Sequence, residues 1–374
     1  MTSEPSADVR LDGDHPLDAE ACASVLVGAV ERASPSGCEA DVAAYLVDAM
    51  RPWSERAEID EAGNAVGWFG TGPLRIVALG HLDTAPGWWP VTRAGHELRG
   101  RGSVDAKGSL CALACAAARL PAALRSRLSV QVIGAVEEEC DTSKGARHAL
   151  QAYPRPDLVI VGEPSGWDAY TLGYKGRLAV EIRAERAEGH SAAQEASAAA
   201  VAANAWHMLE AWAHDASEGA AGAFDAVQAT LLGIASASDG LRQRAVAHVA
   251  FRLPPGLDAA AAAARVEATL RPLVARAGVA LRMSGGEGAY RGPRDGPLPR
   301  ALRVAIRAEG GTPRPLLKTG TSDMNVIAPT WDVPMLAYGP GDASLDHTPD
   351  ERIDLREYAR SIRVLERVFT ALAT

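Results

Sequence analysis

Cysteine is scarce in this sequence of 374 residues, and its spacing matches no common metal or disulfide pattern. There are five cysteines, an odd number, and no two of them are spaced as Cys-x-x-Cys. Neither a disulfide framework nor a thiolate zinc site is therefore indicated. Cys111 and Cys115 lie four residues apart in an alanine-rich stretch, which favours small side chains buried on one helix face.

Long apolar runs and an excess of positive charge are also missing. No apolar run approaches the ~20 residues that span a bilayer, so we expect no membrane partner. The net charge of −9 argues against nucleic acid as a partner. The first twenty residues are polar and acidic and lack the basic-then-apolar plan of a secretory signal. We therefore expect a cytoplasmic protein.

The composition is that of a folded chain with more than one core. Hydrophobic residues make up 47% and charged residues 23% of the sequence. A chain of 374 residues is long for one core, so two domains are expected. Strand-like apolar runs alternate with a helical stretch at 108–120, which predicts an α/β domain with a mainly parallel sheet. These runs lie around residues 65–69, 75–80, 128–136 and 158–161.

The pattern changes after Gly173. Strand, helix, strand, strand, helix and strand are predicted in turn, which is the split βαβ or ferredoxin-like α+β order. Helical and apolar runs of the α/β type then resume and continue to a closing helix at 355–372. We expect a flexible extension over 1–18, one domain formed by 19–173 and 285–374, and a second domain inserted over 174–284.

Acidic and histidine residues directly follow several of the apolar runs. Open α/β sheets place their active-site groups at strand ends, so these side chains are candidates for one site. Two histidines and several carboxylates gathered there indicate a metal site. The residues are His81 and Asp83, Asp105 in a glycine-flanked loop, Glu137 to Glu139, Glu163 and His347.

Each of these motifs has a plainer interpretation when it is taken alone. A His-x-Asp pair can be structural, and three consecutive glutamates can form a solvated loop. Close to a buried strand end, however, the glutamates repel one another unless cations compensate them. The glycine-rich loop around Asp105 could cradle phosphate, but neither the P-loop nor the dinucleotide pattern is present.

Together, the motifs resemble those of the M20 family of di-zinc amidohydrolases and peptidases. The resemblance runs from about Ala33 to the C-terminus, with the motifs in the family's order. It implies two divalent metal ions, zinc in the first place and cobalt or manganese as alternatives. By motif, His81 and Glu163 bind one ion, Glu139 and His347 bind the other, and Asp105 bridges them.

The resemblance also implies roles in catalysis. Glu138 takes the family's general-base position, and Asp83 orients His81. His190 is assigned to oxyanion stabilisation, often across a homodimer interface formed by the inserted dimerisation or lid domain. Glu137 stands where many members have aspartate, a departure that leaves the base and ligand positions intact.

Three further stretches resemble the hydrolases that release lysine or ornithine from an amino-group carrier protein. They are residues 162–168, 172–177 and 318–325. Those enzymes cut the amide between the carrier's C-terminal glutamate side chain and the α-amino group of the product. The resemblance implies an acidic carrier protein as substrate. Candidates for holding its carboxylates are Lys175, Arg177, Arg252 and Lys318, with Arg242 and Arg244 beside them.

Other functions share these metal motifs and stay open at this point. Acetylornithine deacetylases, succinyl-diaminopimelate desuccinylases and dipeptidases carry the same pattern. A net charge of −9 opposes an acidic carrier unless a local basic patch faces it. A metal-dependent binding protein is the non-enzymatic alternative, which the intact Glu138 disfavours.

Overall fold

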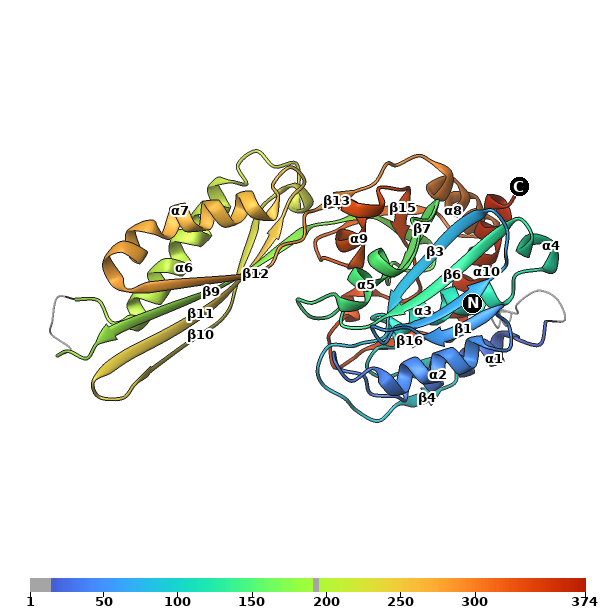
Figure 1. The fold of residues 1–374 in the computed structure, drawn as a ribbon, viewed down its shortest axis with the longest axis horizontal. Coiled ribbons are helices and arrows are strands. Elements are labelled where there is room, and N and C mark those ends of the chain that lie inside the picture. Colours follow the sequence, from blue (N-terminus) through green and yellow to red (C-terminus); the bar gives the residue numbers. More distant parts are fainter. Residues whose placement is uncertain (1–14, 191–194) are drawn as a thin grey trace, which may run out of the picture. The chain divides into compact units, whose positions relative to one another are not determined.

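The computed structural model describes residues 15–190 and 195–374, which form two compact units (Figure 1). The first unit contains the chain up to Gly173, Gly292–Leu316 and Val326–Thr374. The second contains Tyr174–Arg291 and Leu317–Asn325. Residues 285–291 and 317–325, which we expected in the first domain, therefore cluster with the second unit. Among the described residues, no helix is long and apolar enough to cross a membrane.

The first unit is built on a mixed sheet whose middle is parallel. In spatial order its strands are β1 (Arg56–Ile59), β2 (Ala65–Phe69), β6 (Leu128–Ala135), β3 (Leu74–His81), β7 (Leu158–Gly162), β15 (Met335–Ala337) and β8 (Ala169–Tyr174), with β14 (Arg314–Lys318) paired to β8. β3 pairs in parallel with β6 and β7, and β15 pairs in parallel with β7. The mainly parallel α/β sheet is thus confirmed, although β8 and β14 were not foreseen.

Glycines let one helix lie close against the ends of the parallel strands. Helix α3 (Lys107–Ala118) is buried along its whole length and contacts β3, β6 and β7. A Cβ atom at Gly162 would lie 2.8 Å from Leu113 Cδ1, and one at Gly80 would lie 3.1 Å from Leu110 Cβ. Larger residues would push α3 away from the sheet. This packing fixes the position of Asp105, which lies just before α3.

Other helices and a small sheet complete the first unit. The C-terminal helix α10 packs against both α3 and α8, so it closes the core over the sheet. The small sheet pairs β16 with β5 and β5 with β4, and so joins segments more than 200 residues apart. The elements are α1 (Ala19–Val30), α2 (Ala40–Met50), α4 (Ala122–Arg125), α5 (Lys144–Ala152), α8 (Pro297–Ala308), α9 (Asp323–Trp331), α10 (Leu355–Leu372), β4 (Thr92–Ala94), β5 (Glu97–Arg99), β16 (Arg352–Asp354) and a 3₁₀ turn at Ala343–Leu345.

The second unit has the β-α-β-β-α-β order predicted from the sequence. Its antiparallel sheet runs β10-β11-β9-β12, and α6 and α7 lie on one face of it (Figure 1). The first of its two predicted helices, α6, begins at Ala198, where Ser197 Oγ accepts a hydrogen bond from Ala200 N. Residues 191–194, just before it, lie outside the described part. The elements are β9 (Gly176–Ala187), α6 (Ala198–Asp215), a 3₁₀ turn (Ala223–Asp225), β10 (Gln228–Ser238), β11 (Arg242–Leu253), α7 (Ala259–Ala277), β12 (Val279–Gly285) and β13 (Tyr290–Arg291).

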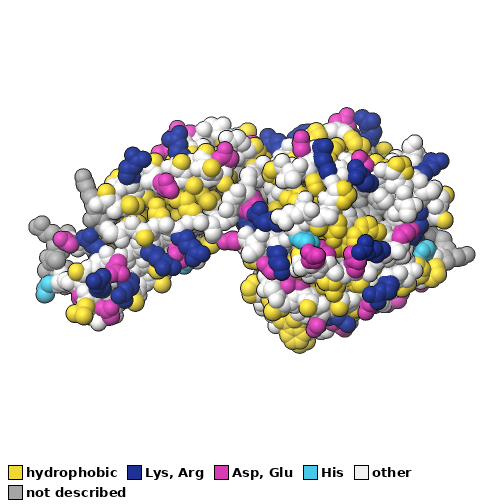
Figure 2. Space-filling model, viewed as in Figure 1, with side chains coloured by type: hydrophobic (Ala, Val, Ile, Leu, Met, Phe, Trp, Pro, Cys, Tyr) yellow, Lys and Arg dark blue, Asp and Glu magenta, His cyan; other side chains and the backbone are white. Residues whose placement is uncertain are grey.

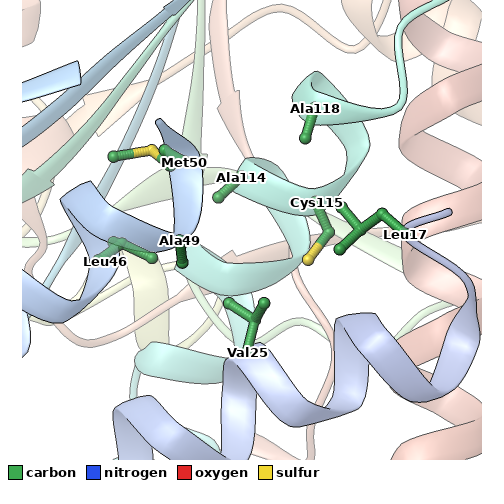
Figure 3. A pocket seen from close by; sticks show the side chains of 8 residues that line it. All are labelled: Leu17, Val25, Leu46, Ala49, Met50, Ala114, Cys115 and Ala118. Atoms are coloured by element: carbon green, nitrogen blue, oxygen red, sulfur yellow. The ribbon is translucent and has the colours of Figure 1, made fainter. Parts of the chain in front are cut away.

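The flexible extension expected over residues 1–18 does not hold for its last residues. Leu17 is only 7% exposed and lines a cavity of about 10 Å³ between α1, α2 and α3, with Val25, Leu46 and Cys115 among its neighbours (Figure 3). The next residue, Asp18, caps α1 by accepting a hydrogen bond from Ala21 N. The chain is therefore part of the first core from Leu17 onward. Residues 1–14 of the expected extension lie outside the described residues.

We predict that Leu17→Ala destabilises the first unit by about 2–3 kcal/mol, because it enlarges a cavity that is lined by apolar side chains. Val304→Ala is a matched control, since Val304 is 59% exposed. It should change the free energy of unfolding by less than about 0.5 kcal/mol. Urea unfolding followed by circular dichroism, at equal metal content, compares the two. Equal effects of the two substitutions would show that Leu17 is not part of the core.

Candidate metal centre

Neighbouring parallel strands of the first unit deliver the predicted ligands at one edge of the sheet. His81 is the last residue of β3, Glu163 directly follows β7, and Glu139 lies shortly after β6. His347 lies in the loop after β15, and Asp105 lies in the loop before α3, joined to Ala106 by a cis peptide bond. Parallel strands end at the same edge of the sheet, so His81 and His347, which are 266 positions apart in the chain, meet there.

These five residues form two groups that share one carboxylate. His81, Asp105 and Glu163 make one group, and Asp105, Glu139 and His347 make the other. Within each group, one nitrogen or oxygen atom per residue lies within 4.8 Å of the others. Asp105 Oδ1 lies 3.3 Å from His81 Nε2, and Asp105 Oδ2 lies 3.0 Å from His347 Nε2. The geometry is that of two adjacent ion sites with Asp105 between them.

Positive charge is strongly stabilised at both groups. Hydrogen bonds to Asp105 and Glu139 raise the pKa of His347 to about 10. Burial by itself lowers the pKa of His81, but hydrogen bonds to Asp105 and Asp83 outweigh it and raise this pKa well above 6.5. Imidazole nitrogens and carboxylate oxygens are also the donor set that zinc and similar divalent ions take in proteins. The residues present therefore fit a pair of divalent metal ions.

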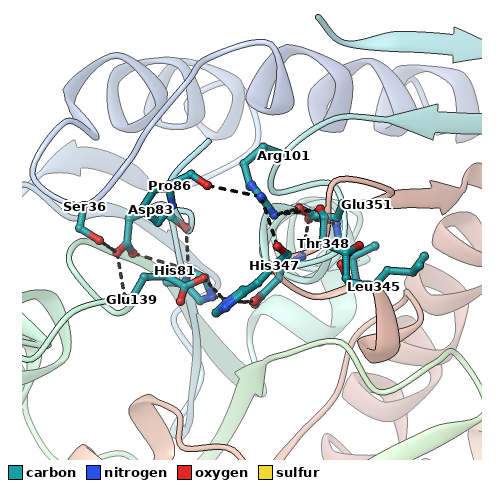
Figure 4. A network of polar contacts seen from close by, with 12 residues as sticks. Ser36, His81, Asp83, Pro86, Arg101, Glu139, Leu345, His347, Thr348 and Glu351 are labelled. Carbon is teal, nitrogen blue, oxygen red and sulfur yellow. Dashed lines mark hydrogen bonds and ion pairs between the residues drawn. The ribbon is translucent and has the colours of Figure 1, made fainter. Parts of the chain in front are cut away.

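Asp83 organises the surroundings of His81 (Figure 4). The Asp83 side chain is fully buried, and its Oδ1 lies 3.5 Å from His81 Nδ1. Asp83 Oδ1 accepts a hydrogen bond from Glu138 N, and Asp83 Oδ2 accepts from Glu139 N and from Ser36 Oγ. His81 Nδ1 is hydrogen-bonded to the backbone carbonyl oxygen of Asp83 at 2.8 Å. The Asp83 main chain thus orients the imidazole ring, while its carboxylate holds the backbone of the glutamate turn. Nothing in the sequence singled out Ser36.

A buried ion pair behind the centre joins two ligand loops. Glu351 is 1% exposed, and its Oε1 accepts hydrogen bonds from Val104 N and Asp105 N at 2.9 and 3.0 Å. Its Oε2 lies 2.9 Å from Arg101 Nη1, and Arg101 also donates to the carbonyl oxygens of His347 and Thr348 (Figure 4). No sequence motif pointed to this ion pair, because Glu351 follows Asp105 by 246 residues and belongs to no catalytic motif.

Lys175, one of the predicted substrate contacts, has a structural role in the second unit. The side chain is fully buried, and its Nζ donates hydrogen bonds to Ala223 O, Ala226 O and Gln228 Oε1. These acceptors use all three N–H donors of the ammonium group. The prediction that Lys175 holds a substrate carboxylate is therefore contradicted by this geometry.

The other predicted substrate and oxyanion residues also belong to the second unit. Arg177 and Arg252 face each other in register on β9 and β11; Arg177 donates to Glu287 Oε2 and Arg252 to Thr321 Oγ1. Lys318 Nζ lies 6.0 Å from the centre of the Tyr174 ring. His190 is exposed just beyond β9, and the exposed Arg242 and Arg244 both pair with Glu185. Their predicted roles stay predictions.

The fold and the paired ligand groups define a metal-dependent amidohydrolase. The chain belongs to Peptidase family M20/M25/M40, which it matches over residues 77–371. It is 49% identical over 360 residues to the LysW-lysine hydrolase of Deinococcus radiodurans, a match that covers 95% of this chain and 98% of that protein. It is 38% identical over 344 residues to a putative LysW-lysine/LysW-ornithine hydrolase of Pyrococcus abyssi, covering 92% and 91%.

Solved structures of M20 and related peptidases share this fold. The M20 family metallo-carboxypeptidase Sso-CP2 from Sulfolobus solfataricus superimposes with a TM-score of 0.79 at 16% identity, over 94% of this chain and 99% of that one. Human carnosine dipeptidase 1 gives a TM-score of 0.76 at 15% identity, over 95% and 96%. At this level of identity the likeness concerns the fold alone.

We predict that Glu351→Gln weakens metal binding by roughly 10–100-fold, the usual cost of losing a group that positions metal ligands. Both carboxylate oxygens of Glu351 accept hydrogen bonds, one from Arg101 Nη1 and the other from the backbone N–H groups of Val104 and Asp105. Glutamine replaces one of these oxygens by an NH₂ group, which cannot accept a hydrogen bond, so one set of these bonds is lost in either orientation of the amide. Competition with a chromogenic chelator measures the affinity. Glu97→Gln, an exposed change on the neighbouring β5, is the control and should leave it unchanged. Full affinity in Glu351→Gln would contradict this positioning role.

Proposed function

We propose that this chain hydrolyses the amide that joins lysine to the amino-group carrier protein LysW and releases the free amino acid. The observation that carries this proposal is the 49% identity to the LysW-lysine hydrolase of Deinococcus radiodurans across 95% of the chain. Relatives named for both lysine and ornithine are more distant, at 38% identity or less, which favours lysine over ornithine. A cytoplasmic location accords with this chemistry and stays a prediction.

We assign the two ligand groups to two zinc ions. His81 and Glu163 would hold one ion, Glu139 and His347 the other, and Asp105 would bridge them. The carboxylates of Asp105, Glu139 and Glu163 offset most of the charge of two divalent ions, so the loaded centre can stay largely buried. When bound, such a pair of ions polarises an amide carbonyl and lowers the pKa of the attacking water.

The chain's own residues would manage the proton during hydrolysis. Glu138 accepts the proton of the attacking water as that water adds to the amide carbon. It then delivers the proton to the nitrogen of the product as the C–N bond breaks. Asp83 holds the Glu138 backbone through the hydrogen bond from Glu138 N to Asp83 Oδ1, and so fixes the point from which the Glu138 side chain extends. A base held in position needs little reorganisation when the reaction occurs.

The charge of the chain does not oppose a protein substrate uniformly. The net charge is −9, and repulsion of an acidic carrier was an argument against this function. On the face shown in Figure 2, however, basic and acidic side chains are interspersed over both units. Acidic side chains do not form one continuous patch on this face, so local basic side chains can contact an acidic partner.

We also propose that the second unit forms a homodimer and supplies His190 to the partner's centre. β10 is an edge strand of the second sheet, and an unpaired edge is a ready template for another chain. Exposed apolar residues lie on β10 and at the turn after it: Leu232, Ile234 and Leu241, the last 80% exposed. Contact with a second copy would bury them.

A panel of substrates tests the proposed function. We expect cleavage of carrier-linked lysine with a kcat/KM well above that for carrier-linked ornithine, acetylornithine, succinyl-diaminopimelate and simple dipeptides. The physical reason is that contacts to parts of the carrier far from the cleaved amide can lower the barrier for cleavage of that substrate, and small substrates lack these parts. Release of the amino acid is measured by chromatography. Preferential cleavage of a small acylated amino acid would replace the carrier assignment with a deacylase.

We predict that Glu138→Gln lowers kcat by ~10²–10⁴-fold, because the amide cannot accept the water's proton. The variant should keep about two metal equivalents per chain, measured by elemental analysis. Glu137→Gln is the matched control next to it; Glu137 belongs to neither ligand group and should keep most activity. Loss of metal from Glu138→Gln would mean that the roles of Glu138 and Glu139 are exchanged.

Mixing two inactive variants tests the role of His190. If His190 acts in the partner's site, heterodimers of His190→Ala and Glu138→Gln contain one site with both groups intact, and partial activity should return. Light scattering reports the oligomeric state, and subunit exchange is verified with a tagged copy. A monomer, or an exchanged mixture that stays inactive, would contradict the arrangement.

A further inference from the structure

Lys107 is a buried cation that the proposed mechanism does not use. The residue is 1% exposed, and its Nζ donates one hydrogen bond, to Arg32 O at 2.7 Å. Among the described residues, no carboxylate forms an ion pair with this ammonium group. An ammonium group buried without a charged partner is costly. Two of its three donors have no acceptor among the described protein atoms.

The local structure makes room for this lysine. Gly102 adopts φ +84°, and a Cβ atom there would lie 2.7 Å from Thr84 Cγ2 and 3.0 Å from Lys107 Cδ. Only glycine at position 102 therefore leaves room for the aliphatic stem of Lys107 beside Thr84. The backbone around Gly102 thus holds the Lys107 ammonium group in one place, unlike the ammonium group of a flexible surface lysine.

Lys107 lines a pocket of about 140 Å³ in the first unit. Pro35, Ala85 and Trp88 provide apolar walls, while Thr84 and Arg101 add a hydroxyl and a second cation. The charge of Arg101 is balanced by Glu351, whereas that of Lys107 is not balanced by a direct partner. Trp88 is 56% exposed, so the pocket has an aromatic residue that solvent and ligands can reach.

We propose that this pocket binds a carboxylate on a short aliphatic stem. The Lys107 ammonium supplies the charge, and Pro35, Ala85 and Trp88 contact the stem. Thr84 directly follows Asp83, and Arg101 donates to His347 O, so the pocket adjoins the metal centre. The carboxylate can come from an acidic side chain of the protein substrate or from a free dicarboxylic acid.

Binding of glutarate, with its neutral isostere glutaramide as control, tests the site. The emission of Trp88 is obtained as the difference between the metal-loaded protein and its Trp88→Phe variant. This isolates the pocket from any carboxylate that binds at the metals. We expect a saturable change with glutarate and none with glutaramide. Lys107→Met should weaken binding tenfold or more, while Arg75→Met, an equal charge change on the exposed surface, should not.

A substitution on the rim keeps the test decisive if Lys107→Met does not fold. Ala33 is exposed and lines the same pocket. Ala33→Glu places a tethered carboxylate there and should suppress glutarate binding, while Ala33→Gln should not. The absence of a Trp88 signal, equal signals from glutarate and glutaramide, or unchanged binding in both Lys107→Met and Ala33→Glu would overturn the proposal.

A second arm identifies the source of the carboxylate and rests on the proposed function. If the protein substrate supplies it, Ala33→Glu should raise the KM for carrier-linked lysine several-fold, and glutarate should compete with that substrate. If glutarate binds but the KM is unchanged, the pocket takes a free acid. Failure of the native protein to cleave carrier-linked lysine would refute the proposed function, while the Trp88 measurement would still decide the pocket.

Discussion

Crowding of carboxylates at one edge of a sheet is the constraint on which the rest of this structure depends. Asp83, Asp105, Glu139 and Glu163 converge there, and like charges at such distances repel unless they are compensated. Asp83 is compensated by two backbone N–H groups and the His81 ring, and Asp105 lies between the imidazoles of His81 and His347. The proposed pair of divalent ions would complete the balance and would link metal binding to local stability.

Rigid packing behind this edge converts the crowding into a defined geometry. The glycines at the ends of β3 and β7 let α3 lie against the strands, and α3 in turn fixes Asp105. The Arg101–Glu351 pair ties the Asp105 loop to the His347 loop. Ligands that are held by packing and by hydrogen bonds to their neighbours bind metal with less loss of conformational entropy.

Much of this could be anticipated because the signals are local. The α/β sheet follows from short apolar runs, and the second unit from its β-α-β-β-α-β order; both predictions are confirmed. The metal groups could be anticipated because each ligand directly follows a strand or lies in a short motif. β8, β14 and the small β16-β5-β4 sheet were missed, because their short strands depend on partners far along the chain.

The sequence by itself determined which side chains are candidates for the metal centre, because the residue types and their spacing along each strand are local properties. Only the tertiary structure decided what holds them: Glu351 and Ser36 meet the centre through contacts that no spacing encodes. It also turned Lys175 from a presumed substrate contact into a buried structural cation, and Lys107 into the wall of a pocket. The sequence specifies which side chains can be charged. Their burial and their hydrogen-bond and ion-pair partners, which decide the role of each charge, arise only when distant segments pack together.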